Sequence, residues 1–133
     1  MISNNSYLKI IDGLEQMALT NLWLATSDSI FYDFPKKYSE TYQGRIELFF
    51  IVLGRLIEEK KLRLAKKGEF LQGTIDEQLA LFKNAFPDEE RMKEVETYWW
   101  FLDDCPAGVV WILDREIESF TTTAGDGKFY YWA

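Results

Sequence analysis

Asp103, Asp104 and Cys105 are the adjacent residues whose types could do chemistry in this sequence. A cysteine becomes a nucleophile when a base or a positive neighbour lowers the pKa of its thiol, whereas paired carboxylates can act as acid and base or bind a hard cation. Two adjacent carboxylates disfavour a thiolate, and their spacing lacks the alternation of a calcium loop. We therefore expect Cys105 to be a small buried residue and expect no metal site here.

The rest of the chain offers no catalytic motif. The sequence contains no histidine, which removes the side chain most often used as a general base near neutral pH and as a metal ligand. It also excludes Ser-His and Cys-His nucleophile pairs, and no glycine-rich phosphate loop occurs. We expect a protein that is not an enzyme and that has no cofactor.

The net charge of the chain is concentrated around the same residues. The 133-residue chain carries a formal charge of −7, and the stretch from Asp88 to Thr121 accounts for all of it. An acidic chain is not expected to bind nucleic acid directly, because affinity for phosphates comes from lysine and arginine. A basic protein partner suits this charge, although many acidic proteins carry such a charge only for solubility. The chain also has one basic patch, Lys60–Lys67, whose role the sequence leaves open.

Aromatic residues lie among the acids of this stretch. Four of them, residues 98–101, are successive in a helix predicted over 88–103, so they point in all directions and Tyr98 or Trp100 is expected to be partly exposed. Tyrosine and tryptophan often dominate the binding energy of interfaces. The candidate partner-binding residues are therefore Glu94, Glu96, Tyr98, Trp100, Asp103, Asp104, Asp114, Glu116 and Glu118. Trp100 is the first choice as an anchor, and the competing interpretation is a helix covered on both faces.

Apolar periodicity predicts the elements that position these residues. Three more helices are expected over about 6–24, 40–60 and 75–85, with caps at Ser6, Ser39 and Thr74 and with the second helix at the centre of the core. The segment 25–38 between the first two is predicted to be a loop with room for a short helical turn. Its apolar residues Ile30, Phe31, Tyr32 and Phe34 are expected to lie over the core.

The remaining segments predict strands. Residues 62–71 are typical of a β-hairpin that turns at Lys66-Lys67-Gly68. Near the C-terminus, Val109–Leu113 is expected to be covered on both faces, and Phe129–Trp132 follows a clear turn. Together with residues 116–122 these predict a small antiparallel β-meander. The expected fold is a single α+β domain of about four helices, the meander and the hairpin.

The location of the protein is predicted from what the sequence lacks. The N-terminus has no pattern of a signal peptide, and the longest apolar run, residues 48–53, is far too short to span a membrane. The single cysteine cannot form an internal disulfide. We expect a cytoplasmic protein without a membrane partner.

Two blocks of the sequence resemble a known family. They are Leu53–Pro87 and Trp99–Ile112, and the segment Cys-Pro-Ala-Gly-Val-Val-Trp at 105–111 is the most distinctive part. They resemble a family of short bacterial proteins of unknown function, from which no activity and no catalytic residue can be carried over. In size, acidity and scarcity of cysteine the chain is also similar to immunity proteins of bacterial toxin systems. That second resemblance implies a basic toxin, such as a nuclease domain, as the partner.

The sequence leaves three functions open. The first is an immunity-type inhibitor that neutralises a basic partner through the acidic, aromatic-containing surface. The second is a small-molecule-binding or carboxylate-based enzyme domain with a pocket between the helix 88–103 and the C-terminal sheet, where Asp103 or Asp104 would act. The third is a homo-oligomeric assembly subunit in which Phe129–Trp132 completes a sheet edge across two chains.

Overall fold

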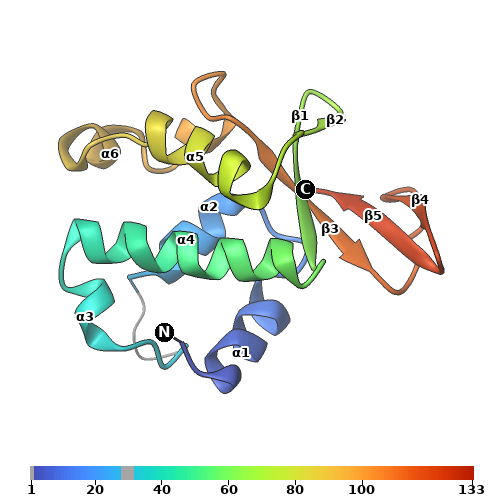
Figure 1. The fold of residues 1–133 in the computed structure, drawn as a ribbon, viewed down its shortest axis with the longest axis horizontal. Coiled ribbons are helices and arrows are strands. Elements are labelled where there is room, and N and C mark those ends of the chain that lie inside the picture. Colours follow the sequence, from blue (N-terminus) through green and yellow to red (C-terminus); the bar gives the residue numbers. More distant parts are fainter. Residues whose placement is uncertain (1, 28–31) are drawn as a thin grey trace.

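Helix α4 (Tyr42–Glu58) is the element against which the other layers pack (Figure 1). The computed structural model describes residues 2–27 and 32–133. Along α4, the side chains of Leu48, Phe49, Val52 and Leu53 are wholly buried. The sequence correctly predicts a central helix here, but α4 begins later than expected. Thr41 rather than Ser39 caps it, because the Thr41 hydroxyl accepts from the amide of Gly44 while Ser39 ends the preceding helix α3 (Lys36–Ser39).

The N-terminal region forms two helices where the periodicity predicts one over 6–24. These are α1 (Asn4–Leu14), capped by Ser3 instead of Ser6, and α2 (Leu19–Ala25). The chain turns between them at Gln16, whose φ of 76° is left-handed. The reason is tertiary: the Trp111 indole donates to the backbone carbonyl of Met17 at 2.8 Å, which gives the turn a partner outside the helix.

The apolar residues of the loop after α2 lie over the core where the structure describes them. Tyr32 and Phe34 are buried and stack with ring centres 5.6 Å apart, which confirms that part of the prediction. Ile30 and Phe31 lie outside the described residues.

The predicted hairpin and the predicted C-terminal strands belong to one antiparallel sheet. The strands are β1 (Leu62–Lys66), β2 (Glu69–Phe70), β3 (Gly108–Leu113), β4 (Thr121–Gly125) and β5 (Lys128–Trp132). Their order is β2-β1-β3-β5-β4. The α+β class is therefore confirmed, while the strand order differs from a sequential meander. Because β5 lies between β3 and β4, this strand is paired on both sides. Residues 129–132 therefore do not form the free sheet edge that the homo-oligomer hypothesis requires.

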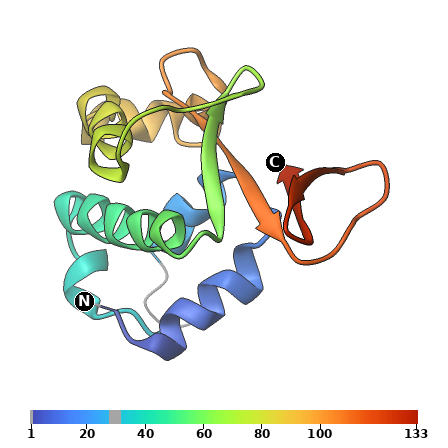
Figure 2. The same cartoon turned by 45° about the vertical axis from the view of Figure 1, so that its right-hand side comes forward.

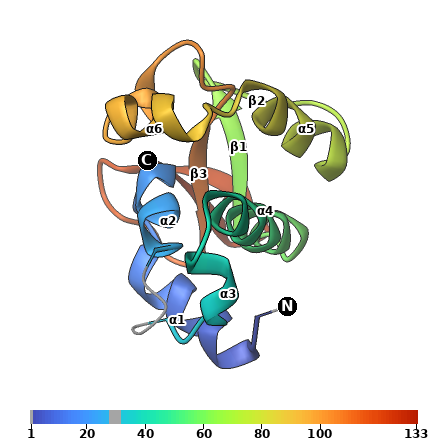
Figure 3. The same cartoon turned by 90° about the vertical axis from the view of Figure 1, so that its left-hand side faces the viewer.

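The helices gather on one side of this sheet (Figures 2 and 3). The core between them is made by β3 residues such as Val109 and Trp111 on one side and by Trp23, Phe49 and Leu53 on the other. Helix α5 (Ile75–Ala85) lies where predicted, and Thr74 and Glu77 form the expected capping box. Among the described residues no helix is long and apolar enough to cross a bilayer.

The helix predicted over 88–103 is the main correction to the local structure. Helix α6 covers only Glu89–Val95, and a turn then leads into a short 3-10 helix, η1 (Trp99–Phe101). In a continuous α-helix the Glu96 carbonyl would accept from the backbone amide of Trp100. Here it accepts from the Trp100 indole N–H at 3.1 Å instead. A side-chain hydrogen bond thus replaces a helical one where the helix stops.

Candidate protein-binding surface

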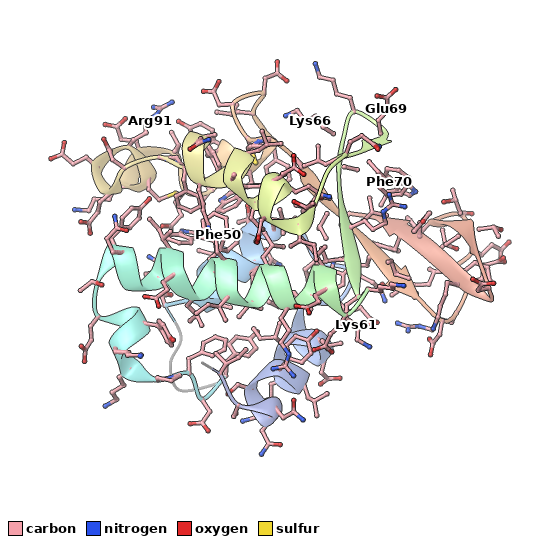
Figure 4. All side chains as sticks on the ribbon, in the orientation of Figure 1. Phe50, Lys61, Lys66, Glu69, Phe70 and Arg91 are labelled. Atoms are coloured by element: carbon pink, nitrogen blue, oxygen red, sulfur yellow. The ribbon has the colours of Figure 1, made fainter. Side chains whose placement is uncertain are left out.

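The acids of α6 face solvent. Asp88 caps the helix by accepting from the amide of Arg91 at 2.8 Å, and Glu89 and Glu90 occupy its first turn. Glu94 is exposed and lies 3.5 Å from the guanidinium of Arg91, which points outward from α6 (Figure 4). A pair this exposed contributes little to stability, so Glu94 remains available to a partner.

Two aromatic side chains project from the turn that follows α6. Tyr98 is 47% exposed and Phe101 is 70% exposed. The amide of Phe101 donates to the carbonyl of Tyr98 at 3.0 Å. This is the spacing of a 3-10 turn, in which residues three apart lie on the same side. Tyr98 and Phe101 therefore share one exposed side of the turn.

The two aspartates continue the same surface. Asp103 and Asp104 are both exposed, and Asp103 lies 4.0 Å from the ammonium of Lys67 on the β1–β2 hairpin. We call the set Glu94, Tyr98, Phe101, Asp103 and Asp104 the acidic–aromatic surface. It runs from α6 through η1 to the loop before β3.

Lys66 holds the end of this surface in place. Its ammonium reaches from β1 and donates to three backbone carbonyls, those of Leu102 at 3.3 Å, Asp103 at 3.5 Å and Cys105 at 2.6 Å. Lys66 lies on the side of the hairpin nearest this loop (Figure 4). One member of the basic patch thus fixes the loop that carries the two aspartates.

Trp100, the expected anchor, is in the core. It is only 5% exposed. Its ring centre lies 5.0 Å from that of Trp99, 5.4 Å from that of Phe49 and 5.9 Å from that of Phe86. Of the two residues expected to be partly exposed, Tyr98 is exposed and Trp100 is not. The choice of Trp100 as the anchor is wrong, because the chain leaves the α-helix before Trp100 and both tryptophans turn inward.

Glu96 also lies away from the exposed surface. It is half-buried, and its carboxylate accepts from the indole N–H of Trp23 at 3.2 Å. The guanidinium of Arg45 lies over the ring of that indole, with Cζ 4.1 Å from the ring centre. Burial lowers the pKa of Arg45, and the charge of Glu96 opposes this by raising it. The Glu96 carboxylate therefore binds a buried indole and is less exposed than the other acids of the candidate set.

The remaining candidates lie elsewhere on the molecule. Asp114, Glu116 and Glu118 are exposed on the connection between β3 and β4, at the opposite end from α6 (Figure 1). Arg115 in this connection binds Glu15 at 3.0 Å and Asp114 at 3.7 Å. The nine residues expected to form one surface are thus split into two separate places and a buried part.

A hollow does exist between the end of η1 and the sheet, where the sequence suggests a ligand pocket. It encloses about 320 Å³ beside Phe101, Asp103 and Trp132. The Asp103 side chain is 88% exposed, so this hollow contains no carboxylate shielded from water. Cys105 is buried as expected, and burial raises the pKa of its thiol, whose hydrogen bond goes to the carbonyl of Ala107. Over residues 2–27 and 32–133, no cluster of three or more Cys, Asp or Glu side chains could hold a metal ion.

Phe101 is the exposed aromatic residue of the acidic–aromatic surface that is absent from the candidates chosen from the sequence. A continuous helix makes every aromatic in 98–101 a candidate, so periodicity alone could not select it. The neighbouring residues in the sequence give no signal for the change from α-helix to 3-10 helix that leaves this side chain exposed.

Comparison with known proteins places the chain in a family without an assigned activity. The model of a family of proteins of unknown function, DUF596, matches residues 57–133, and the chain belongs to that family. No curated protein matches the chain. The solved structure of an uncharacterised protein conserved in bacteria, from Neisseria meningitidis, is similar over 95% of this chain and 83% of its own, with a TM-score of 0.62 and 20% identity. At that identity the likeness shows a shared fold.

Proposed function

We propose that this member of the DUF596 family is a non-enzymatic binding protein of the immunity type, which neutralises a basic protein partner through the acidic–aromatic surface. One observation carries the proposal: Tyr98 and Phe101 project into solvent from a segment that is flanked along the chain by the exposed carboxylates of Glu94 and of Asp103 and Asp104. Aromatic side chains ringed by charged residues are the usual composition of an interface centre and its rim.

The carboxylates would act mainly on the association rate, by attracting the basic partner before the two proteins touch. The stretch that contains them holds the whole net charge of −7. A concentrated charge of one sign steers an oppositely charged partner and raises its association rate, an effect that added salt weakens. The partner's own basic site would then be covered by the acids that attracted it.

The two aromatics would supply the contact energy. Phe101 is 70% exposed and Tyr98 is 47% exposed, so each has apolar area that a partner can remove from water. The 3-10 turn fixes their positions, and Lys66 fixes the loop that follows. A preorganised surface loses less conformational entropy on binding.

The test compares two variants with the same change in net charge. E94K/D103K/D104K alters the acidic–aromatic surface, and D114K/E116K/E118K alters the connection between β3 and β4 by the same number of charges. Each variant and the wild type serve as bait in lysate of the source organism, with elution by a salt gradient. We expect the wild type and the second variant to retain the same basic protein, and the first to lose it.

A third variant separates contact from steering. Y98A/F101A leaves every charge in place and removes both rings. We expect it to lower the affinity for the captured protein by about tenfold or more, mainly through faster dissociation. Equal loss with both lysine variants would reduce the effect to net charge and would contradict the proposed surface.

A further inference from the structure

Three arginines of this protein lie against aromatic rings. Arg45 stacks on Trp23 with Cζ 4.1 Å from the ring centre, and Arg55 stacks on Tyr7 at 3.7 Å. Arg63 stacks on Phe70 at 3.6 Å. All three are half-buried, so each needs hydrogen-bond acceptors for its N–H groups.

Two of the three arginines have these acceptors within the protein. Arg55 binds the Glu59 carboxylate at 2.8 Å and the Asn4 side-chain oxygen at 2.6 Å. Arg45 donates to the Thr26 hydroxyl and to the Trp23 carbonyl. The guanidinium groups of Arg45 and Arg55 thus each have two hydrogen-bond acceptors within the protein.

Arg63 is different. Its one side-chain hydrogen bond among the described residues goes to the hydroxyl of Tyr130 at 3.0 Å. As with Arg45, no carboxylate in residues 2–27 or 32–133 lies within ion-pair distance of Arg63. The guanidinium has five N–H donors, so most of its capacity to bind an anion is unused.

Arg63 lies on the outer face of the sheet, the face turned away from the helices, and aromatic rings hold it in position there. Phe70 on β2 and Trp132 on β5 come from strands separated by β1 and β3, yet their ring centres are 5.3 Å apart. Phe70 reaches from the hairpin toward β5 (Figure 4). These rings, with Tyr130, close over the outer face, where Val110 is only 1% exposed. Arg63 is held between Phe70 and Tyr130.

A hollow of about 450 Å³ lies beside Arg63. It is bounded by the end of α4, the start of α5 and strands β1, β3 and β5. Its apolar lining is Ile57, Leu62, Ile75 and Ile112, and its polar lining is Glu58, Lys60, Arg63 and Tyr130. The volume falls within the range of small-ligand sites, which combine apolar walls with a few converging polar groups.

We propose that this hollow binds a small organic acid, with its carboxylate on Arg63 and Lys60 and its apolar body against the isoleucines. Lys60 is exposed and forms no ion pair with any described residue, so two cations of the lining are available to an anion. An anion on Arg63 would gain charge-assisted hydrogen bonds from a guanidinium whose position is already fixed. Glu58, the one acid of the lining, favours a singly charged head over a more highly charged one.

This site is independent of the acidic–aromatic surface, because none of its residues belongs to that surface and the two have opposite charge. The experiment uses hexanoate as the probe and hexylammonium, with the same chain length and the opposite charge, as the matched control. Inorganic phosphate tests the charge alone. Methyl NMR spectra of the full chain report the isoleucines of the hollow directly. We expect saturable shifts of Ile75 and Ile112 with hexanoate, and weaker or absent shifts with the other two compounds.

Variants then assign the anion contact. R63M keeps the apolar stem but removes the guanidinium, K60M removes the second cation, and K61M removes a neighbouring exposed lysine that does not line the hollow. We expect R63M and K60M to weaken hexanoate binding by about tenfold and K61M to leave it unchanged. If R63M fails to fold, K60M against K61M still decides. Absence of saturable shifts, equal binding of hexylammonium or phosphate, or unchanged affinity in both R63M and K60M would overturn the proposal.

Discussion

The ammonium of Lys66 donates to the backbone carbonyl of Cys105 at 2.6 Å and so joins β1 to the loop before β3. The same group reaches the carbonyls of Leu102 and Asp103. A lysine of the basic patch thus stabilises the geometry of the acidic segment through backbone contacts. The neighbouring Lys67 only approaches the Asp103 carboxylate, at 4.0 Å and with both side chains mostly exposed.

This contrast predicts the effect of removing each lysine. K66M leaves three carbonyls without their shared donor, and we expect it to lower the free energy of unfolding by about 1–2 kcal/mol. We also expect faster amide hydrogen exchange at Cys105, whose N–H bonds to Leu102. K67M should change the stability by less than about 0.5 kcal/mol. Urea unfolding and hydrogen exchange of both variants provide the check, and equal effects would show that the carbonyl contacts contribute nothing.

Removing the Glu96 carboxylate should lower the free energy of unfolding, whereas removing that of Glu94 should not. E96A leaves the indole N–H of the fully buried Trp23 without its acceptor, which costs about 1–3 kcal/mol. E96Q keeps an acceptor oxygen and should lose less. E94A removes an exposed carboxylate and should stay within about 0.5 kcal/mol of the wild type. Thermal and urea unfolding of the three variants would measure these differences, and a stability loss in E94A as large as in E96A would contradict the assigned role.

Truncation of Trp100 should lower the stability of the protein, whereas truncation of Phe101 should lower its affinity for a partner. Trp100 packs against Phe49, Phe86 and Trp99, so W100A should destabilise the protein by about 3–5 kcal/mol. Phe101 is mostly exposed, and F101A should cost less than about 0.5 kcal/mol while it weakens partner binding. Denaturant unfolding separates the two roles. A large stability loss in F101A would mean that its ring packs against the protein in solution.

The sequence predicts those parts of the fold that depend on local patterns. The capping box at Thr74 and Glu77 and the hairpin turn at Lys67-Gly68 lie where predicted, because a few neighbouring residues determine each of them. The position of β5 between β3 and β4 could not be predicted in this way, since strand order depends on which apolar faces meet in the folded chain.

The errors at the candidate site have a common physical cause. Trp111, Trp23 and Trp100 each donate an indole N–H to an acceptor at a helix end or turn: the Met17 carbonyl, the Glu96 carboxylate and the Glu96 carbonyl. Buried tryptophans need such acceptors. Apolar periodicity counts tryptophan only as a large hydrophobic residue. It therefore predicts that the helices over 6–24 and 88–103 continue past the residues whose oxygens accept from these indoles.

Tyr42 provides a test by pH. Its hydroxyl donates to the Pro87 carbonyl at 2.6 Å, and its pKa is raised to about 12, first by burial and then by the charges of Asp88, Glu89 and Glu96. An unfolded tyrosine titrates near pH 10. The folded state therefore holds this proton more tightly, so the stabilising contribution is complete below about pH 10 and is lost as the pH rises through 12.

The comparison with Y42F isolates that contribution. At pH 8 the wild type should be more stable than Y42F by about 1 kcal/mol, the usual contribution of one hydrogen bond. We expect this difference to shrink steadily between about pH 10 and pH 12, because only the wild type has a hydroxyl to ionise on unfolding at this position. Urea unfolding at a series of pH values measures the difference directly. A difference that stays constant over that range would mean that the Tyr42 hydroxyl is not held in the buried, hydrogen-bonded position beside Pro87.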